Sequence, residues 1–444
     1  MQRRLDPLSR RALLTAAVQV GLVPLVPLVP LVCPEILSGS DDELQRRLDA
    51  VPPGGTFVID TQLVRTDSLR VTRPVTIRFV GGSIRMRSDA DALRVSTSDV
   101  LVLDPVITGA GAETGGLGRG VAFVGNALAP IRNVRVRGGV ITDIPHDGVS
   151  FAYCTGFESS RTVIRRTGYS GVLVIGGVDG TLQDLTVDDV RQPAGRPNSY
   201  GITISRDATL DVAHARRSSR VRVLRNTVSR VLQWEGIDTH AGEAIEIRGN
   251  RVSECRVGIA AVPSKDPADR SETLLAPLGV VIADNSVTKS VDLADGAGIL
   301  VSGAGATVGS DRERATVTVS GNTVQGCGGG LDGGAVLLKL TSGAVVEDNR
   351  LLDSRTSAIS LPHSNHEVSV ARNTVRTVAG GGIGVNVPHG ANSGTIASNR
   401  FEDSTPRLAV ALRFGTAPNR FTLRGNDPGN AVLPEATGGA IITR

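Results

Sequence analysis

One asparagine recurs through the second half of the chain, and its period restricts the fold more than any other feature. It follows strand-like segments in short motifs such as VLRNTV, IRGNRV and VSGNTV. The repeated positions are Asn226, Asn250, Asn285, Asn322, Asn349, Asn373, Asn399 and Asn426. Their separations of 24 to 37 residues leave room for three short strands per repeat, which bury their inner faces only when successive repeats stack. The period therefore predicts a coiled parallel β-solenoid.

The composition agrees with many short strands joined by tight turns. Gly occurs 53 times in 444 residues, whereas aromatic residues make up only 3%. We expect the repeated asparagines to hydrogen-bond from coil to coil, as polar ladders do in other stacked β structures. Cys255 and Cys327 lie in one column two coils apart, roughly 9 to 10 Å, which is too far for a disulfide. We predict that both, together with Cys154, are small buried residues.

The first 39 residues resemble an export leader. The segment Ser9–Thr15 (SRRALLT) is similar to a twin-arginine signal, and an apolar segment follows it. Prolines at every third residue from Pro24 to Pro30 interrupt a continuous membrane-spanning helix. We therefore predict a leader over residues 1–39, a secreted or extracytoplasmic protein and no stable membrane insertion. The alternative is an apolar tail that is never removed.

The solenoid is predicted to span residues 40–430, with a tail or cap over 431–444. Its first segment, SDDELQRRLDAVPPGG, predicts one short helix, because Ser40 and Glu43 form a capping box. Leu44, Leu48 and Val51 give this helix an apolar stripe. Such a helix covers the open end of the stack, where unpaired strand edges would otherwise invite association.

Four insertions lengthen coils in the middle of the chain. They span residues 191–199, 206–219, 263–277 and 302–315, and they bracket the segment Trp234–His240. Insertions in solenoids tend to gather on one face, so we predict that these wall a binding site. The alternative is a set of neutral surface loops, which tolerate extra length at small cost.

The strand EGIDTH carries the strongest candidate for chemistry. With Ile237 facing the core, alternation sends Asp238 and His240 to the outer face, roughly 6.5 to 7 Å apart. We interpret this spacing as one that straddles a sugar ring. Neighbouring coils hold no matching acid or histidine, so the pair is local. The alternative is a solvated pair that bonds to nearby arginines or water.

From about Ser40 to Asn426 the chain resembles the right-handed parallel β-helix superfamily of pectate lyases, alginate lyases and epimerases. The resemblance rests on the opening LQRRLDAVPPGGTFVID and on the asparagine-bearing coils. It implies an all-β fold: a single-stranded right-handed parallel β-helix of about 11 to 13 coils with a short N-terminal capping helix. It is specific for the fold alone, because the superfamily also contains hydrolases, tailspikes and adhesins.

The strand EGIDTH is itself similar to the Tyr-Gly-Phe-Asp-Pro-His motif of alginate lyases and mannuronan C5-epimerases. Asp238 and His240 match the Asp and His of that motif, while Glu235 stands where the family has its catalytic Tyr. Tyr200, one coil earlier in the column of Glu235, is a phenol that can take that place. This resemblance implies an exported enzyme that abstracts the C5 proton of a uronic acid in an acidic polysaccharide, as a lyase or an epimerase.

The implied roles follow from the chemistry. His240 acts as the base, Asp238, Arg206 or Lys265 neutralises charge at the substrate carboxylate, and Tyr200 donates a proton. Glu235 is a further catalytic candidate. The candidates for substrate binding are Trp234, Arg206, Lys265, Tyr169, His146 and Asp147.

Two other classes of function remain open. An inverting glycoside hydrolase would use Glu235 and Asp238 as its carboxylate pair. A non-catalytic glycan-binding or surface protein would use only the flank of the solenoid. The formal net charge of +4 includes no basic run, so a polysaccharide or oligosaccharide is the expected partner and a nucleic acid is not. We expect a monomer without cofactor or metal; scattered aspartates leave calcium open, but their spacing identifies no site.

Overall fold

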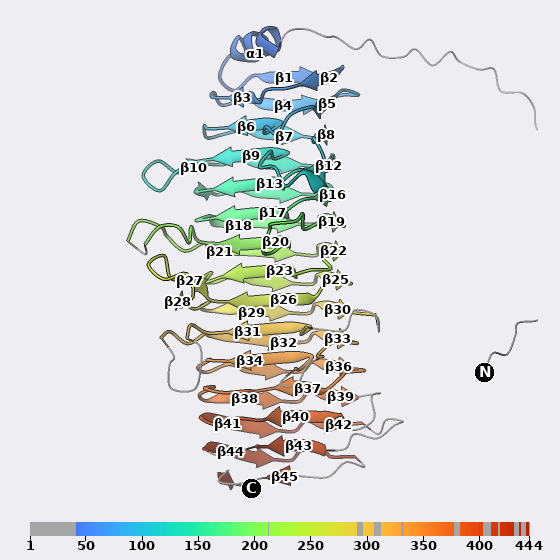
Figure 1. Cartoon of the computed structure of the whole chain (residues 1–444), viewed down its shortest axis with the longest axis vertical. Coiled ribbons are helices and arrows are strands. Elements are labelled where there is room, and N and C mark those ends of the chain that lie inside the picture. Colours follow the sequence, from blue (N-terminus) through green and yellow to red (C-terminus); the bar gives the residue numbers. More distant parts are fainter. Residues whose placement is uncertain are drawn as a thin grey trace, which may run out of the picture. The chain divides into compact units, whose positions relative to one another are not determined.

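Three parallel sheets run along the stack, because each coil contributes a short strand to each of them (Figure 1). The computed structural model describes residues 41–443, except 212, 291–295, 306–311, 330–332, 377–381, 403–409, 416–417, 430–434 and 437–440. They belong to a unit that starts at residue 36. The predicted leader, Cys33 and Ser40 lie outside the described residues. Among those described, no helix has the length and apolarity to cross a membrane.

The first sheet pairs in parallel along its whole length. Its strands are β1 (Thr56–Ile59), β4 (Thr76–Phe79), β7 (Leu101–Leu103), β10 (Ile131–Arg132), β11 (Arg135–Arg137), β14 (Cys154–Thr155), β15 (Glu158–Ser160), β18 (Val178–Gln183), β21 (Ser219–Leu224), β24 (Glu246–Arg248), β29 (Val280–Ala283), β32 (Val317–Ser320), β35 (Val345–Glu347), β38 (Val368–Ala371), β41 (Asn392–Ala397), β44 (Asn419–Arg424) and β46 (Ile441–Thr443).

The second sheet consists of strands of two to five residues and holds 13 of them within the described residues. They are β2 (Gln62–Arg65), β5 (Ser83–Met86), β8 (Val106–Thr108), β12 (Val140–Ile144), β16 (Val163–Thr167), β19 (Thr186–Asp188), β22 (Thr227–Ser229), β25 (Arg251–Ser253), β30 (Ser286–Thr288), β33 (Thr323–Gln325), β36 (Arg350–Leu352), β39 (Thr374–Arg376) and β42 (Arg400–Phe401).

The third sheet carries the candidate site and holds 14 described strands, close to the predicted number of coils. They are β3 (Leu69–Val71), β6 (Leu93–Val95), β9 (Val121–Val124), β13 (Asp147–Ala152), β17 (Ser170–Ile175), β20 (Tyr200–Ser205), β23 (Glu235–His240), β26 (Val257–Val262), β31 (Ile299–Ser302), β34 (Val336–Lys339), β37 (Ser357–Ser360), β40 (Ile383–Val387), β43 (Val410–Phe414) and β45 (Glu435–Ala436). Strands β45 and β46 continue the pairing past residue 430, the predicted end of the solenoid.

The core forms because equivalent residues of successive coils stack on one another. In the third sheet Ile202 pairs with Ile237, Ile237 with Ile259, and Ile259 with Ile299, and all four side chains are fully buried. Each removes most of its apolar surface from water only because another coil lies above and below it. The predicted alternation of inner and outer residues is confirmed here.

The predicted asparagine ladder is also confirmed. From Asn250 onward, each side-chain oxygen accepts hydrogen bonds from the backbone N–H and the amide of the preceding rung, as Asn285 does from Asn250 at 2.9 Å for both bonds. In every rung before the last, the side-chain amide donates to the next rung and to a strand carbonyl, so these buried polar groups are satisfied. A second ladder through Asn365, Asn392 and Asn419 was not predicted.

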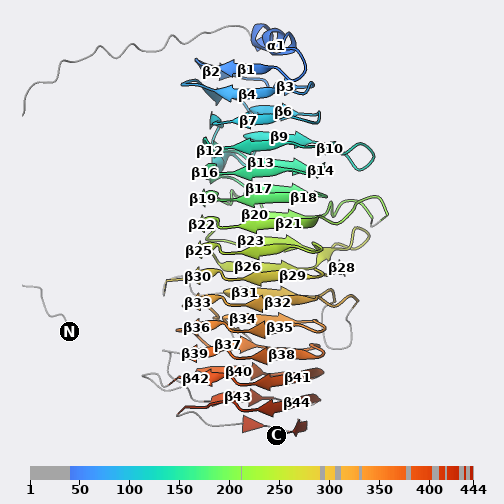
Figure 2. The same ribbon diagram turned by 180° about the vertical axis from the view of Figure 1, so that it is seen from behind.

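The helix at the start of the stack, α1 (Asp41–Asp49), agrees with the sequence (Figure 2). Leu48 is buried, and Leu44 and Val51 pack against the core of the first coils. Cys154, Cys255 and Cys327 are buried free thiols, as predicted, and burial raises the pKa of Cys255 to about 12. Such thiols fill space and are poorly reactive.

Candidate active site

A pocket of about 480 Å³ lies on the outer face of the third sheet, over β17, β20 and β23. Its floor comes from outward-facing strand residues such as Leu173, Thr203 and Ser205. The insertion 191–199 enters β20 from one edge, and the insertions 206–219 and 263–277 leave the sheet at the other. Three of the four predicted insertions therefore wall the pocket.

The wall residues come from loops that are far apart in sequence. They are Arg196, Pro197, Asn198, Arg206, Asp207, Ala208, Thr209, Ser264, Lys265 and Arg270. The third of these loops is held by a short hairpin of β27 (Ser264–Lys265) and β28 (Thr273–Leu275). No described residue of the fourth insertion lines the pocket. Its Arg312 supports the third insertion through a 2.9 Å ion pair with Asp266.

Strand register brings the candidate residues of two coils together. Tyr200 pairs with Glu235, and Thr203 pairs with Asp238, one strand spacing apart. Asp238 and His240 lie on the outer face, as alternation predicted. Their side chains do not straddle a ligand, however, because Nε2 of His240 lies 3.0 Å from Oδ2 of Asp238. Asp238 is fully buried and needs a partner for its charge, so the two side chains converge.

His240 is held in its charged form. Its Nε2 faces the Asp238 carboxylate and lies 3.3 Å from the phenol oxygen of Tyr200, while its Nδ1 lies 3.3 Å from the carbonyl oxygen of Pro263. Both ring nitrogens thus face acceptors, which suits an imidazolium. Burial alone would lower the pKa of His240, but the Asp238 carboxylate outweighs it and raises the pKa to about 9.

Tyr200 is a buried phenol that keeps its proton. Its oxygen accepts a hydrogen bond of 2.5 Å from the Asn198 amide and faces the protonated His240. Burial, and then the negative charge of Asp238, raises the pKa of Tyr200 well above its usual value. Because its oxygen already faces two N–H donors, the phenol proton is left to point elsewhere, and Tyr200 lines the pocket.

Glu235 is buried behind these groups and does not line the pocket. Its Oε2 has no hydrogen-bond partner within the described part of the chain, and burial followed by the charge of Asp238 raises its pKa to about 8. This shift favours the protonated form of the Glu235 carboxyl group. With Glu235 protonated, these groups form one buried cluster with a single ion pair and no net charge.

The ligand atoms of Glu235, Asp238 and His240 lie within 4.8 Å of one another, a spacing at which a cation can be held. The ion pair with His240 already neutralises Asp238. The same spacing counts against an inverting hydrolase that uses Glu235 and Asp238. Such an enzyme needs its carboxyl groups about 6.5 to 9.5 Å apart, with room for water between them.

The pocket also contains unpaired positive charge. Arg206 is 1% exposed, and its Nε and Nη1 have no hydrogen-bond partner among the described residues. The Nε of Arg196 is also buried without a hydrogen-bond partner among the described residues. Burying a guanidinium without an acceptor is costly, so these arginines place positive charge at the pocket wall that an anionic ligand would offset. Lys265 lines the pocket as well.

The remaining predicted residues divide between the pocket and its surroundings. His146 and Tyr169 line the pocket, and Asp147 is buried beside His146. Trp234 does not line it and instead stacks with Arg256 at 5.4 Å. Arg196, Asn198 and Arg270 also line the pocket and were not predicted as site residues, because they lie in insertions whose sequence gives no signal for single residues.

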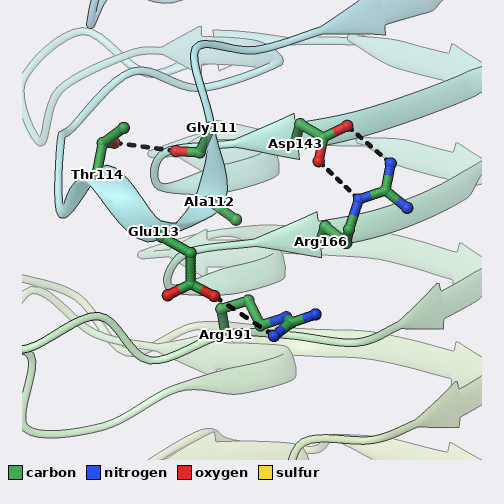
Figure 3. A pocket seen from close by; sticks show the side chains of 7 residues that line it. All are labelled: Gly111, Ala112, Glu113, Thr114, Asp143, Arg166 and Arg191. Carbon is green, nitrogen blue, oxygen red and sulfur yellow. Dashed lines mark hydrogen bonds and ion pairs between the residues drawn. The ribbon is translucent and has the colours of Figure 1, made fainter.

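A second hollow, of about 580 Å³, lies beside the short helical turn Ala112–Thr114 (Figure 3). All four charged side chains that line it are paired. Asp143 bonds to Arg166 at 2.6 Å, and Arg191 contacts Glu113 at 3.4 Å. This hollow therefore presents no unsatisfied charge to a ligand, unlike the pocket at His240.

We expect stability to depend on the charge of His240. Because its pKa is raised from 6.5 to about 9, its contribution is complete below pH 6.5 and is lost as the pH rises through about 9. Thermal unfolding midpoints across this range should fall in the parent protein. His240→Gln should remove most of this dependence, and an equal fall in both proteins would contradict the assigned ion pair.

Comparison with known proteins supports the fold. The family model described as a right handed beta helix region matches residues 269–427, about a third of the chain. The catalytic unit of an α-1,3-glucanase of family GH87 from Streptomyces thermodiastaticus is 16% identical, with a TM-score of 0.55 over 89% of this chain and 67% of that chain. By sequence, no curated protein matches the chain.

Two further structures are similar. The tailspike protein of Escherichia coli bacteriophage HK620, in complex with a pentasaccharide, is 12% identical, with a TM-score of 0.53 over 92% of this chain and 75% of that chain. A periplasmic alginate epimerase is 12% identical over 90% of this chain and 82% of that chain, but its TM-score of 0.37 is too low to bear on the reaction. This chain spans 61% of a Dettilon tailspike protein, so that relative has segments without a counterpart here. The parallel sheets, the family match and these structures together identify the chain as a right-handed parallel β-helix protein.

Proposed function

We propose that this protein acts on a polysaccharide containing uronic acids and transfers the proton at C5, as a lyase or an epimerase. One observation carries the proposal: a protonated phenol, Tyr200, lies in the same pocket as buried guanidinium nitrogens of Arg206 that lack an acceptor. A uronate supplies the missing acceptor through its carboxylate. The sugar ring of that uronate then lies beside the O–H group of Tyr200.

The charges in the pocket suit the developing transition state. Removing the C5 proton places negative charge on the substrate carboxylate, and preorganised cations stabilise that charge best in a water-poor site. Arg206, Arg196 and Lys265 are placed to do so. Asp238 is not free to neutralise the substrate, because it is already paired with His240.

Tyr200 is the proton donor in this proposal. In an elimination it protonates the leaving oxygen at C4, and in an epimerisation it protonates the opposite face of C5. His240, 3.3 Å away and positively charged, returns a proton to the phenolate. The structure thus favours His240 as a source of protons. The sequence, in contrast, predicts that His240 acts as the base.

The printed descriptions of the similar structures support a saccharide ligand at the level of class. One is a glucanase, and another holds a bound pentasaccharide. An extracytoplasmic location, as the leader segment suggests, would give the protein access to such polymers.

The test is to incubate the full protein with alginate, pectate and glycosaminoglycans. We expect ultraviolet absorbance from an unsaturated product, or exchange of the C5 proton in deuterated water detected by NMR. The matched control is each polymer with its carboxylates reduced to alcohols, which should not react. New reducing ends without unsaturation would indicate a hydrolase instead, and binding without turnover would indicate a non-catalytic glycan-binding protein.

A further inference from the structure

The assignment of His240 as an acid leaves the pocket without a base. We propose that His146, which lies beside the buried carboxylate of Asp147, is the catalytic base of this pocket and takes up the C5 proton. This inference rests on the proposed function and names the residue that completes it. It departs from the expectation that His146 and Asp147 form part of a binding subsite.

The contacts of His146 leave one ring nitrogen free. Its Nδ1 lies 2.8 Å from Oδ2 of Asp147, which is fully buried, and the other carboxylate oxygen accepts a 2.7 Å hydrogen bond from Ser170. The contact with Asp147 lacks hydrogen-bond geometry, so the carboxylate acts on the ring as a nearby negative charge. The Nε2 has no partner in the described part of the chain, and His146 lines the pocket.

The two histidines of the pocket therefore differ in what they are able to do. His240 has an acceptor at each ring nitrogen, so both nitrogens are committed as donors. The Nε2 of His146 faces no acceptor within the described residues, so this nitrogen is open to a substrate in the pocket. Proton abstraction requires a nitrogen lone pair within reach of the substrate. The free base of the pocket is His146.

The position of His146 relative to the proton donor Tyr200 also fits the role of the base. Four rings from four successive coils form a row: His146 and Tyr169 are 4.6 Å apart between centroids, Tyr169 and Tyr200 5.6 Å, and Tyr200 and His240 5.8 Å. The base thus stands at one end of the row and the acid pair at the other. The guanidinium of Arg196 lies 5.5 Å from the centre of the Tyr169 ring, between them.

The proton balance of the step is complete without a further reactant. Nε2 of His146 takes the C5 proton, and the electron pair of that C–H bond passes to the substrate carboxylate, paired with the guanidinium groups. In elimination this pair forms the C4–C5 double bond and the C4–O bond breaks. The leaving oxygen takes the proton of Tyr200, which His240 then replaces.

The test compares His146→Asn with the parent protein on the polymer that reacts. We expect kcat to fall about 100-fold with KM little changed, because the base acts in the transition state and not in binding. The matched control is His366→Asn, an exposed histidine outside the pocket, which should keep the parent rate. Equal thermal unfolding midpoints would show that the variants are folded.

A second measurement needs neither a variant nor a substrate. Nitrogen NMR of the parent protein at neutral pH should show His240 protonated on both nitrogens, so that it cannot accept the C5 proton. If His146→Asn keeps a rate within about threefold of the parent, or if His240 has an unprotonated nitrogen, the inference is wrong. An active parent with an equally active variant would overturn this inference alone, whereas an inactive parent would overturn the proposed function with it.

Discussion

Replacing Tyr200 by Phe should lower kcat on the reactive polysaccharide about 1000-fold while leaving binding largely intact. The substitution removes only the O–H, which points away from the two N–H groups that face the phenol oxygen. Without that proton the leaving oxygen, or the carbanion, loses the donor that the proposal assigns to it. Steady-state kinetics and equilibrium binding of the same oligosaccharide would separate the two effects.

The matched control is Tyr153→Phe, since Tyr153 does not line the pocket. Its hydroxyl bonds to Asp207 at 3.3 Å, so its loss tests the removal of a buried phenol outside the reacting centre. We expect a rate close to that of the parent. A Tyr200→Phe variant that is folded and retains its rate within about threefold would show that Tyr200 is not the donor.

Replacing Asn285 by Ala should lower the free energy of unfolding by about 3 to 5 kcal/mol, because each lost hydrogen bond costs about 1 kcal/mol and buried partners are left unsatisfied. Asn285 accepts two hydrogen bonds from Asn250 and donates to Asn322 and to the carbonyl of Ile247. Urea unfolding followed by circular dichroism measures the loss.

Asn426→Ala is the matched control for the ladder. Asn426 accepts the same pair of bonds from Asn399 and donates to the carbonyl of Ile396, but it stands at the end of the row and is partly exposed. Loss of the Asn426 side chain should therefore lower the free energy of unfolding by clearly less than loss of the Asn285 side chain. Equal destabilisation by both substitutions would mean that stacking between interior rungs adds nothing to the fold.

The fold was predictable because its determinants repeat locally. The period of Asn226 to Asn426 gave the coil, and alternation placed Ile237 in the core and Asp238 outside it. Both depend on neighbours in the same strand and on identical positions one coil away, so no long-range information was needed. The capping helix followed from local signals in the same manner.

The site was predictable only in part. Alternation placed Asp238 and His240 on one face, and column alignment placed Tyr200 beside Glu235, which the strand register confirms. Neither alternation nor column alignment revealed that Asp238 is buried and paired with His240. That contact depends on Thr203 of the adjacent coil, whose hydroxyl donates to Oδ2 at 2.9 Å, and on the loops that exclude water.

The limit of prediction from the sequence is clearest for His146 and Asn198. Ninety-four residues separate His146 from His240, and the sequence contains no signal that their rings belong to one row. Asn198 lies in an insertion with no period, yet its amide reaches the Tyr200 phenol. The sequence by itself determined the coil, the ladder and the direction of each strand side chain, because these follow from repetition over short distances. Only the tertiary structure decided which charges are buried, paired or left open, because those states depend on the distances between loops and coils that meet only when the stack has formed.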